Sequence, residues 1–196
     1  MVTRADHRRA TLTSLSRATT EAFEQLGPSA TIEDIAERAG VSRRTVFRYV
    51  DSKEDLIYLQ PTMWLEVFDE AVSEYRASHD EASVRGRMLY GAQRISEHVD
   101  ADPEPVRRAM MVALELPEYA RGYALMNQLW IERLATEILG DATDDESVFH
   151  SRVLGAAIMG VIDAALHEWV VDQDVKLVDL IDRGLDYLAP ILPDSK

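Results

Sequence analysis

Cationic side chains gather in the segment that follows Gly40. Arg43, Arg44, Arg48 and Lys53 lie within 11 residues of one another. An arginine can donate two hydrogen bonds to the O6 and N7 atoms of guanine, and a lysine can donate to phosphate oxygens. This spacing therefore favours contacts with a nucleic acid. Taken alone, however, such a cluster is also typical of a solvated helix face.

The charge of the chain is unevenly distributed. Its net value of −14 argues against a nucleic-acid partner, but residues 1–56 hold 9 basic and 9 acidic side chains. Residues 57–196 hold the other 12 basic and 26 acidic ones, so the whole negative excess lies there. We therefore expect one domain over residues 1–56 and a second over residues 57–196.

Short helices must position the cations of the first domain. Apolar residues between Leu12 and Leu26 recur at steps of three and four, which predicts a helix that Gly27 ends. Thr31 can cap a second helix together with Asp34, because a hydroxyl followed three places later by a carboxylate satisfies two free backbone amides.

A helix-turn-helix is predicted over the second and third helices. Such a unit needs a small residue where the helices cross, a glycine in the turn and a β-branched apolar residue inside the second helix of the pair. Ala36, Gly40 and Val46 occupy these positions, and Ser42 can cap the third helix. With Val46 and Val50 inward, the outward face is expected to carry Arg43, Arg44, Thr45, Phe47, Arg48 and Tyr49.

The rest of the chain also shows helical periodicity, with proline and glycine as punctuation. A fourth helix is predicted from Ser52 to about residue 77, with a kink at Pro61. Five more follow at about residues 81–99, 103–116, 117–140, 144–171 and 175–188. The predicted fold class is all-α, with about nine helices: an N-terminal three-helix helix-turn-helix domain and a larger C-terminal helical domain.

The run from residue 31 to residue 56, TIEDIAERAGVSRRTVFRYVDSKEDL, resembles the DNA-binding signature of the tetracycline-repressor (TetR) family of bacterial transcription regulators. The resemblance implies a DNA-reading domain followed by a domain for dimerisation and effector binding. It places near DNA phosphates Thr31, Thr45, Tyr49 and Lys53, and towards base edges Ser42, Arg43, Arg44 and Phe47, with Arg48 on the same outward face. Many members have a tyrosine where this chain has Phe47. Phe47 has no hydroxyl and so cannot make the hydrogen bond to phosphate that a tyrosine would make.

The resemblance also implies an effector pocket in the second domain. Candidate ligand-binding residues are apolar or aromatic side chains with a few polar anchors: Trp64, Met88, Gln93, Met111, Tyr123, Asn127 and Trp130. The other interpretation of such residues at helical spacing is ordinary core. Because acidic residues predominate in this domain, we expect an apolar, neutral or cationic effector. An acyl thioester would require the inward orientation of Arg94, Arg107, Arg108 or Arg121.

The eighth predicted helix carries two further patterns. Asp163 and His167 are four residues apart and share a face, which is compatible with a structural hydrogen bond, an interface contact or a ligand-orienting pair. Ala156, Gly160 and Ala164 form a ridge of small residues that lets another helix approach closely. The ridge is interpreted as a homodimer interface, and packing within one chain is the alternative. A two-fold dimer would read two half-sites of a palindrome.

Other function classes lack support. The sequence has no cysteine and neither an HExxH motif nor a phosphate-binding loop, so we expect no catalysis, no metal site and no cofactor. No signal peptide or membrane span is evident, which predicts a cytoplasmic protein.

The predicted partners are double-stranded DNA, a second copy of the chain and a small-molecule effector. The predicted function is therefore a homodimeric repressor released by a small apolar ligand. The alternative is a regulator without such an effector, constitutive or switched by a protein partner.

Overall fold

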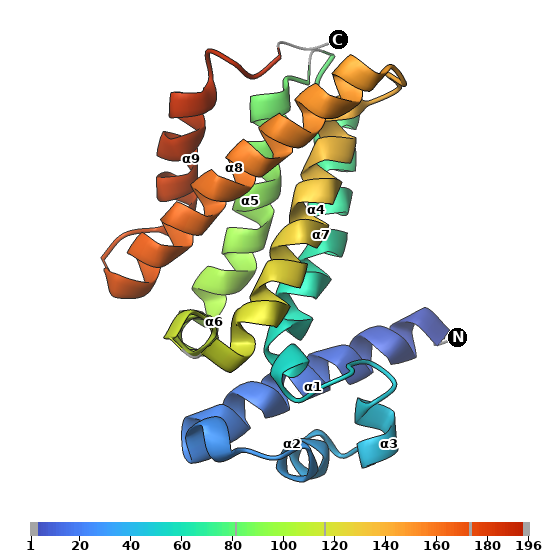
Figure 1. Cartoon of the computed structure of the whole chain (residues 1–196), viewed down its shortest axis with the longest axis vertical. Coiled ribbons are helices and arrows are strands. Elements are labelled where there is room, and N and C mark those ends of the chain that lie inside the picture. The colour runs from blue at the N-terminus through green and yellow to red at the C-terminus, as the bar shows by residue number, and fades with distance from the viewer. Residues whose placement is uncertain (1–3, 81, 116, 173, 194–196) are drawn as a thin grey trace. The chain divides into compact units, whose positions relative to one another are not determined.

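The computed structural model describes residues 4–80, 82–115, 117–172 and 174–193. These residues form helices and no strands, which confirms the all-α prediction (Figure 1). The α-helices are α1 (Arg4–Leu26), α2 (Ile32–Ala39), α3 (Arg43–Val46), α4 (Leu59–Ser78), α5 (Val84–Ala101), α6 (Pro103–Glu115), α7 (Ala120–Leu139), α8 (Asp145–Val171) and α9 (Leu177–Leu188). Three 3₁₀ segments are η1 (Gly27–Ser29), η2 (Glu54–Tyr58) and η3 (Pro117–Tyr119).

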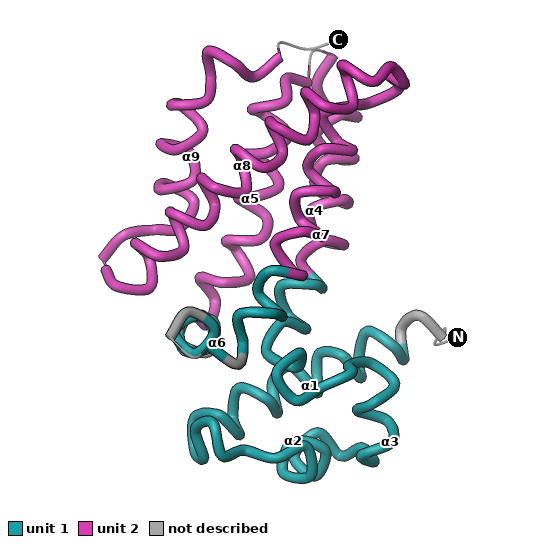
Figure 2. The backbone as a smooth tube through the Cα atoms, viewed as in Figure 1, with its two compact units in different colours: residues 1–63, 103–124 teal, residues 64–102, 125–196 magenta. Residues whose placement is uncertain are grey.

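Two compact units make up the chain (Figure 2). Unit 1 combines Met1–Met63 with Pro103–Ala124, and unit 2 combines Trp64–Asp102 with Leu125–Lys196. Helix α6 therefore packs with the N-terminal helices, although its residues lie after the predicted boundary at residue 56. The units describe packing alone, so the functional division at that residue stays a prediction.

The N-terminal helices of unit 1 share one apolar core. Leu15 of α1, Ile35 of α2 and Val46 of α3 are fully buried and belong to the same cluster. Figure 1 shows α2 and α3 beside α1, and the hydroxyl of Ser14 on α1 donates to the carbonyl of Ala39 at the end of α2 (3.1 Å). The apolar spacing seen in the sequence thus fixes which faces of these helices meet.

The turn between α2 and α3 has the geometry that the sequence predicts. Gly40 adopts φ 67°, a left-handed conformation that costs little only for glycine. The amide of Val41 donates to the carbonyl of Ala36 (3.0 Å), which closes the end of α2. At the other end, Thr31 and Asp34 form the predicted reciprocal cap, with bonds of 3.2 and 2.9 Å.

The segment predicted as the start of the fourth helix differs in detail. Ser52 and Asp55 do form a reciprocal cap, but the next residues form the 3₁₀ segment η2 before α4 begins at Leu59. Pro61 is consequently the third residue of α4, where an amide needs no intrahelical partner. The kink expected from a proline inside a helix is therefore not required.

Close approaches between helices organise unit 2. A Cβ atom added at Gly155 of α8 would lie 2.9 Å from the carbonyl oxygen of Ile131 on α7. One added at Gly184 of α9 would lie 2.3 Å from the side chain of Val161 on α8. Bulkier residues at these glycines would separate the helices, so the two glycines set how closely α7, α8 and α9 pack.

A buried ion-pair cluster joins α4, α5 and α7. The carboxylate of Glu137 on α7 lies 2.7 Å from Arg76 of α4 and 2.8 Å from Arg87 of α5. Both Glu137 and Arg87 are buried. Removal of Glu137 would take the ion-pair partner from the buried Arg87, so the cluster fixes how these helices align.

Helix α8 is the most apolar element of the described chain. By length and composition alone it is able to cross a membrane, a property that core helices of many proteins share. Only 33% of its most apolar stretch of 18 residues is buried, and Phe149 and Val153 are exposed. Exposed apolar faces of this kind are typical of interaction surfaces.

Candidate functional site

The cations of the predicted nucleic-acid face project from unit 1 into solvent. Arg43, Arg44 and Arg48 are exposed, whereas Val46 and Val50 on the opposite side are buried. Helix α3 is short, and Ser42 caps it by accepting a hydrogen bond from the amide of Thr45 (3.1 Å). The local fold thus leaves the guanidinium groups free of the core, as the sequence predicts.

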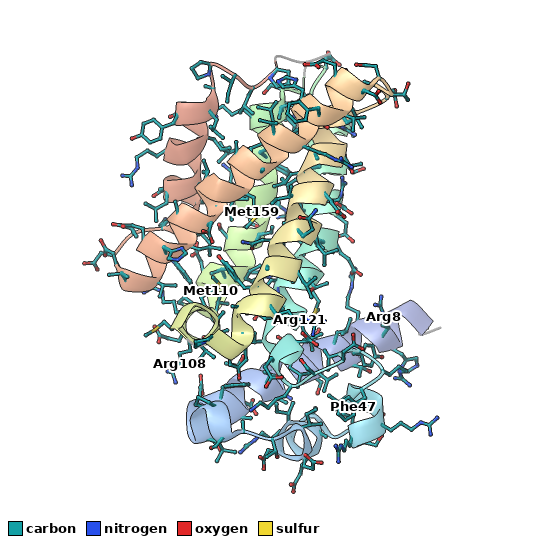
Figure 3. The ribbon with its side chains drawn as sticks, viewed as in Figure 1. Arg8, Phe47, Arg108, Met110, Arg121 and Met159 are labelled. Atoms are coloured by element: carbon teal, nitrogen blue, oxygen red, sulfur yellow. The ribbon has the colours of Figure 1, made fainter. Side chains whose placement is uncertain are left out.

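Two neighbours hold Arg43 in place. Its Nη1 atom lies 2.8 Å from a carboxylate oxygen of Glu33 on α2, and its guanidinium lies 5.3 Å from the ring centre of Phe47. Both partners of the ion pair are exposed, so the pair contributes little to stability and can be exchanged for another partner. Phe47, which is labelled in Figure 3, is also exposed, and it orients Arg43 by stacking.

The contribution of Glu33 was not foreseen from the sequence. Glu33 and Arg43 are ten residues apart and belong to different helices. Only the crossing of α2 and α3 brings them together, so helical periodicity within either element carries no sign of the pair.

The residues assigned to phosphate contacts belong to the same unit. The Nζ atom of Lys53 donates to the carbonyl oxygen of Pro28 (2.7 Å), which fixes the position of its charge. The hydroxyl of Tyr49 accepts from Arg48 (3.2 Å), and this bond lowers the pKa of Tyr49. Thr31 is exposed, and its hydrogen bonds to Asp34 lower the pKa of that carboxyl.

The predicted ligand-binding residues are divided between the two units. Met111 and Tyr123 belong to unit 1, and the others belong to unit 2. Met88 and Trp130 are buried, and the Trp130 ring packs edge-on against Phe68, with ring centres 5.7 Å apart. These contacts are those of a core, the other interpretation given to the pattern. Among the remaining candidates, Gln93 is exposed, whereas half-buried positions are held by Trp64, Asn127 and Tyr123.

The pair on α8 forms a local contact at the protomer surface. Nδ1 of His167 lies 2.8 Å from the carbonyl oxygen of Asp163 and 3.9 Å from its carboxylate. Because a carbonyl only accepts, Nδ1 carries the proton of this bond. The imidazole is about half exposed, so its other nitrogen faces solvent or a partner surface. Within the described residues, no three side chains of metal-ligating type gather into a site.

The small-residue ridge of α8 is open. Ala156, Gly160 and Ala164 are all exposed, and a Cβ added at Gly160 meets no described atom within 4 Å. Packing within one protomer therefore does not use this ridge in the described part of the chain. The homodimer interface stays a prediction that this exposure favours.

Comparisons with known proteins agree with the helix-turn-helix geometry. The family of bacterial regulatory proteins named after TetR matches residues 15–58, and the family of MftR C-terminal domains matches residues 69–193. A mycofactocin biosynthesis transcriptional regulator of Mycobacterium tuberculosis, MftR, is 25% identical over 162 residues, which cover 81% of this chain and 78% of that protein.

Solved structures share the fold. FadR from Thermus thermophilus, a TetR-family repressor in complex with lauroyl-CoA, aligns with a TM-score of 0.60 at 20% identity, over 94% of this chain and 97% of FadR. FadR from Bacillus subtilis, in complex with stearoyl-CoA, gives a TM-score of 0.58 at 20% identity, over 90% and 96%. Together, the two family models, which match residues 15–58 and 69–193, show that this chain belongs to the TetR family of bacterial transcriptional regulators.

Proposed function

We propose that the protein is a homodimeric repressor that binds a palindromic operator in the cytoplasm and is released by a small apolar ligand. The observation that carries the proposal is the arrangement of α3 and the turn after it, in which Arg43, Arg44 and Arg48 are exposed while Val46 is fully buried. A short helix of this kind fits the major groove of B-DNA, where arginine distinguishes guanine from the other bases.

Base reading and phosphate anchoring fall to different residues. Arg43 and Arg44 stand on the first turn of α3, the part of a recognition helix that contacts base edges. Lys53 and Tyr49 lie beyond α3 and offer an ammonium group and a hydroxyl, which are donors of the kind that bind phosphate oxygens. The ion pair of Glu33 with Arg43 must break or be shared when Arg43 donates to a base, so Glu33 also discourages binding to unrelated sequences.

Dimerisation would bring two recognition helices together. The exposed ridge of α8 offers small side chains along a largely apolar helix whose face is otherwise uncovered. A second copy of the same ridge supplies a complementary surface by two-fold symmetry. This contact would cover the exposed apolar face of α8, so the apolar composition of the helix is explained without a membrane.

Ligand release would act by population shift. A ligand that prefers the conformation with unsuitable spacing between the two copies of α3 weakens operator binding by its differential affinity. The acyl thioesters of the FadR complexes are coenzyme A thioesters, whose phosphates need cations in the site. Arg94 is paired with Glu97 (2.6 Å) and Arg108 with Glu24 (3.4 Å). Both of these arginines lie at the surface, whereas Arg107 is buried, so Arg107 is the inward cation that an acyl-CoA ligand would have to use.

The proposal is tested by selection of DNA from a random pool, followed by fluorescence anisotropy with the selected duplex. We expect a palindromic sequence to be enriched and Arg43→Ala to weaken its binding at least tenfold. The matched control is Arg94→Ala, which removes the same charge from unit 2 and leaves affinity unchanged. Failure of the full-length protein to enrich any sequence at low ionic strength would remove the proposal.

A further inference from the structure

A partly open pocket of about 260 Å³ lies in unit 1, between α1, α6 and the junction of η2 with α4, and Met111 of its lining is exposed. Its apolar lining includes Phe23 from α1, Leu56 from η2, and Ala109 and Met111 from α6. This volume is slightly below the roughly 300–1,000 Å³ of pockets for drug-sized molecules. The cavity is therefore suited to a ligand of fewer atoms, held mainly by apolar contact.

Two hydroxyl groups of α1 determine which hydrogen bonds a ligand can make with this helix. Thr19 and Thr20 both line it. The hydroxyl of Thr19 donates its hydrogen to the carbonyl of Leu15 (2.8 Å), and that of Thr20 donates to the carbonyl of Ser16 (3.3 Å). With their hydrogens committed, these hydroxyls can serve a ligand only as acceptors. At these two threonines a ligand group with a hydrogen-bond donor is favoured, whereas Gln60 of the lining can both donate and accept.

The charges of the lining disfavour an anion. Arg108, which is labelled in Figure 3, is the cation of the lining, and it lies 3.4 Å from Glu24 and 3.8 Å from Glu104. Glu24 also lines the cavity. A ligand carboxylate near Arg108 would also lie near these two acids and would meet their repulsion. A neutral ligand leaves the ion pairs intact.

We propose that this cavity is a small-molecule site for a neutral, largely apolar compound with one hydroxyl-type donor, such as a medium-chain alcohol. An occupant contacts α1, η2 and α6 at once and so stabilises their mutual packing. The site lies in the unit that carries α3. Of the residues predicted to bind the effector, Met111 lines it, whereas Met88 and Trp130 are buried in unit 2. The inference concerns binding alone and does not require that the chain bind DNA.

The test is a titration of the full-length protein, carrying ¹³C-methyl methionine, with octanol. Met111 lines the cavity, whereas Met159 is buried in unit 2. We expect a saturable shift of the Met111 methyl resonance and none of Met159. Octanoate has the same chain length but carries a carboxylate, and it should require at least tenfold higher concentration for the same shift.

Variants locate the site independently. Ala109→Trp fills the cavity and should weaken octanol binding at least tenfold, whereas Ala124→Trp, at an exposed alanine of the same unit, should not. Thr20→Val keeps the side-chain shape but removes an acceptor, so it should also weaken octanol binding. It tests the site without Ala109→Trp, should that variant not fold.

Three results would overturn the inference: no saturable shift of Met111, equal binding of octanoate, or unchanged octanol binding by a folded Ala109→Trp variant. A shift of Met159 without one of Met111 would also overturn it, because the ligand would then bind in unit 2. That last result would leave the proposed function intact. Loss of operator binding in a separate assay, by contrast, would remove the proposed function without affecting this site.

Discussion

Lys53 is the residue on which the division between phosphate anchoring and base reading can be measured most directly. Its Nζ atom donates one hydrogen bond to the carbonyl of Pro28 (2.7 Å), and an ammonium group has two further donors for a phosphate. The bond to Pro28 holds the charge at the edge of unit 1 before DNA arrives. Lys53→Ala should therefore remove one phosphate contact per protomer and leave base reading unchanged.

The expected magnitude follows from counterion release. Each phosphate contact contributes about 0.9 to the slope of log affinity against log salt concentration. Raising the salt from 50 to 200 mM weakens affinity by about 3.5-fold for each phosphate contact. A dimer that lacks one contact in each protomer should therefore lose about 12-fold less affinity over this range than the original protein. The variant should bind all duplexes more weakly, by a similar factor for selected and scrambled sequences.

The assay is fluorescence anisotropy at several salt concentrations with a selected and a scrambled duplex. Lys176→Ala is the matched control, because Lys176 is an exposed lysine at the start of α9 in unit 2. It should leave both slopes unchanged. An altered preference between the two duplexes in Lys53→Ala, or a normal salt slope, would refute the assignment of Lys53 to a phosphate.

Three further predictions concern base reading, dimerisation and stability. Arg44→Ala should weaken operator binding by about 1–3 kcal/mol and relax the preference at one base pair per half-site, as measured by selection with the variant. Gly160→Arg fits the open space beside α8 within one protomer and should give a folded monomer by light scattering; a dimer of unchanged mass would exclude the ridge as the interface. Tyr58→Phe removes the buried bond from Tyr58 to the carbonyl of Tyr119 (2.7 Å) and should lower the free energy of unfolding by about 1–3 kcal/mol in urea. Burial raises the pKa of Tyr58, so its neutral form stabilises the fold fully below pH about 10, and stability should fall as the pH rises further. The loss of stability that ionisation of Tyr58 causes at high pH should be absent from Tyr58→Phe. If the variant and the original protein lose stability alike at high pH, this role of Tyr58 is contradicted.

The position of Tyr58 also explains a glycine in unit 1. A Cβ added at Gly122 of α7 would lie 2.3 Å from the Tyr58 ring, so a larger residue would displace a buried aromatic side chain. The hydrogen bond to Tyr119 and this close approach together fix the start of α7 against η2. Neither contact is visible in the periodicity of the sequence, since the partners are about sixty residues apart.

Local interactions explain why much of the reading unit was predictable. The caps at Thr31 and Ser42 and the left-handed turn at Gly40 depend on residues within a few positions of each other. Burial of Val46 follows from spacing within a single element. The outward orientation of the arginines is then unavoidable, because one face of a short helix is already occupied by the core.

Predictions that depended on longer-range packing were less complete. The spacing of apolar residues selected Met88 and Trp130, but it could not separate a ligand contact from the edge-on packing of Trp130 against Phe68. The expected kink at Pro61 assumed a helix that begins at Ser52, whereas the 3₁₀ segment η2 moves the start of α4 to Leu59. Hydrogen-bond type at a helix start depends on the neighbouring packing, which sequence does not specify.

The sequence by itself determined the all-α class, the helix-turn-helix and the identity of its exposed cations, because caps, turns and amphipathic faces are encoded within a few residues. The tertiary structure decided that Glu33 accompanies Arg43, that α6 packs with the N-terminal helices, and that a cavity lies beside Met111. Each of these features joins segments distant along the chain, and only the packing of whole helices brings such segments together.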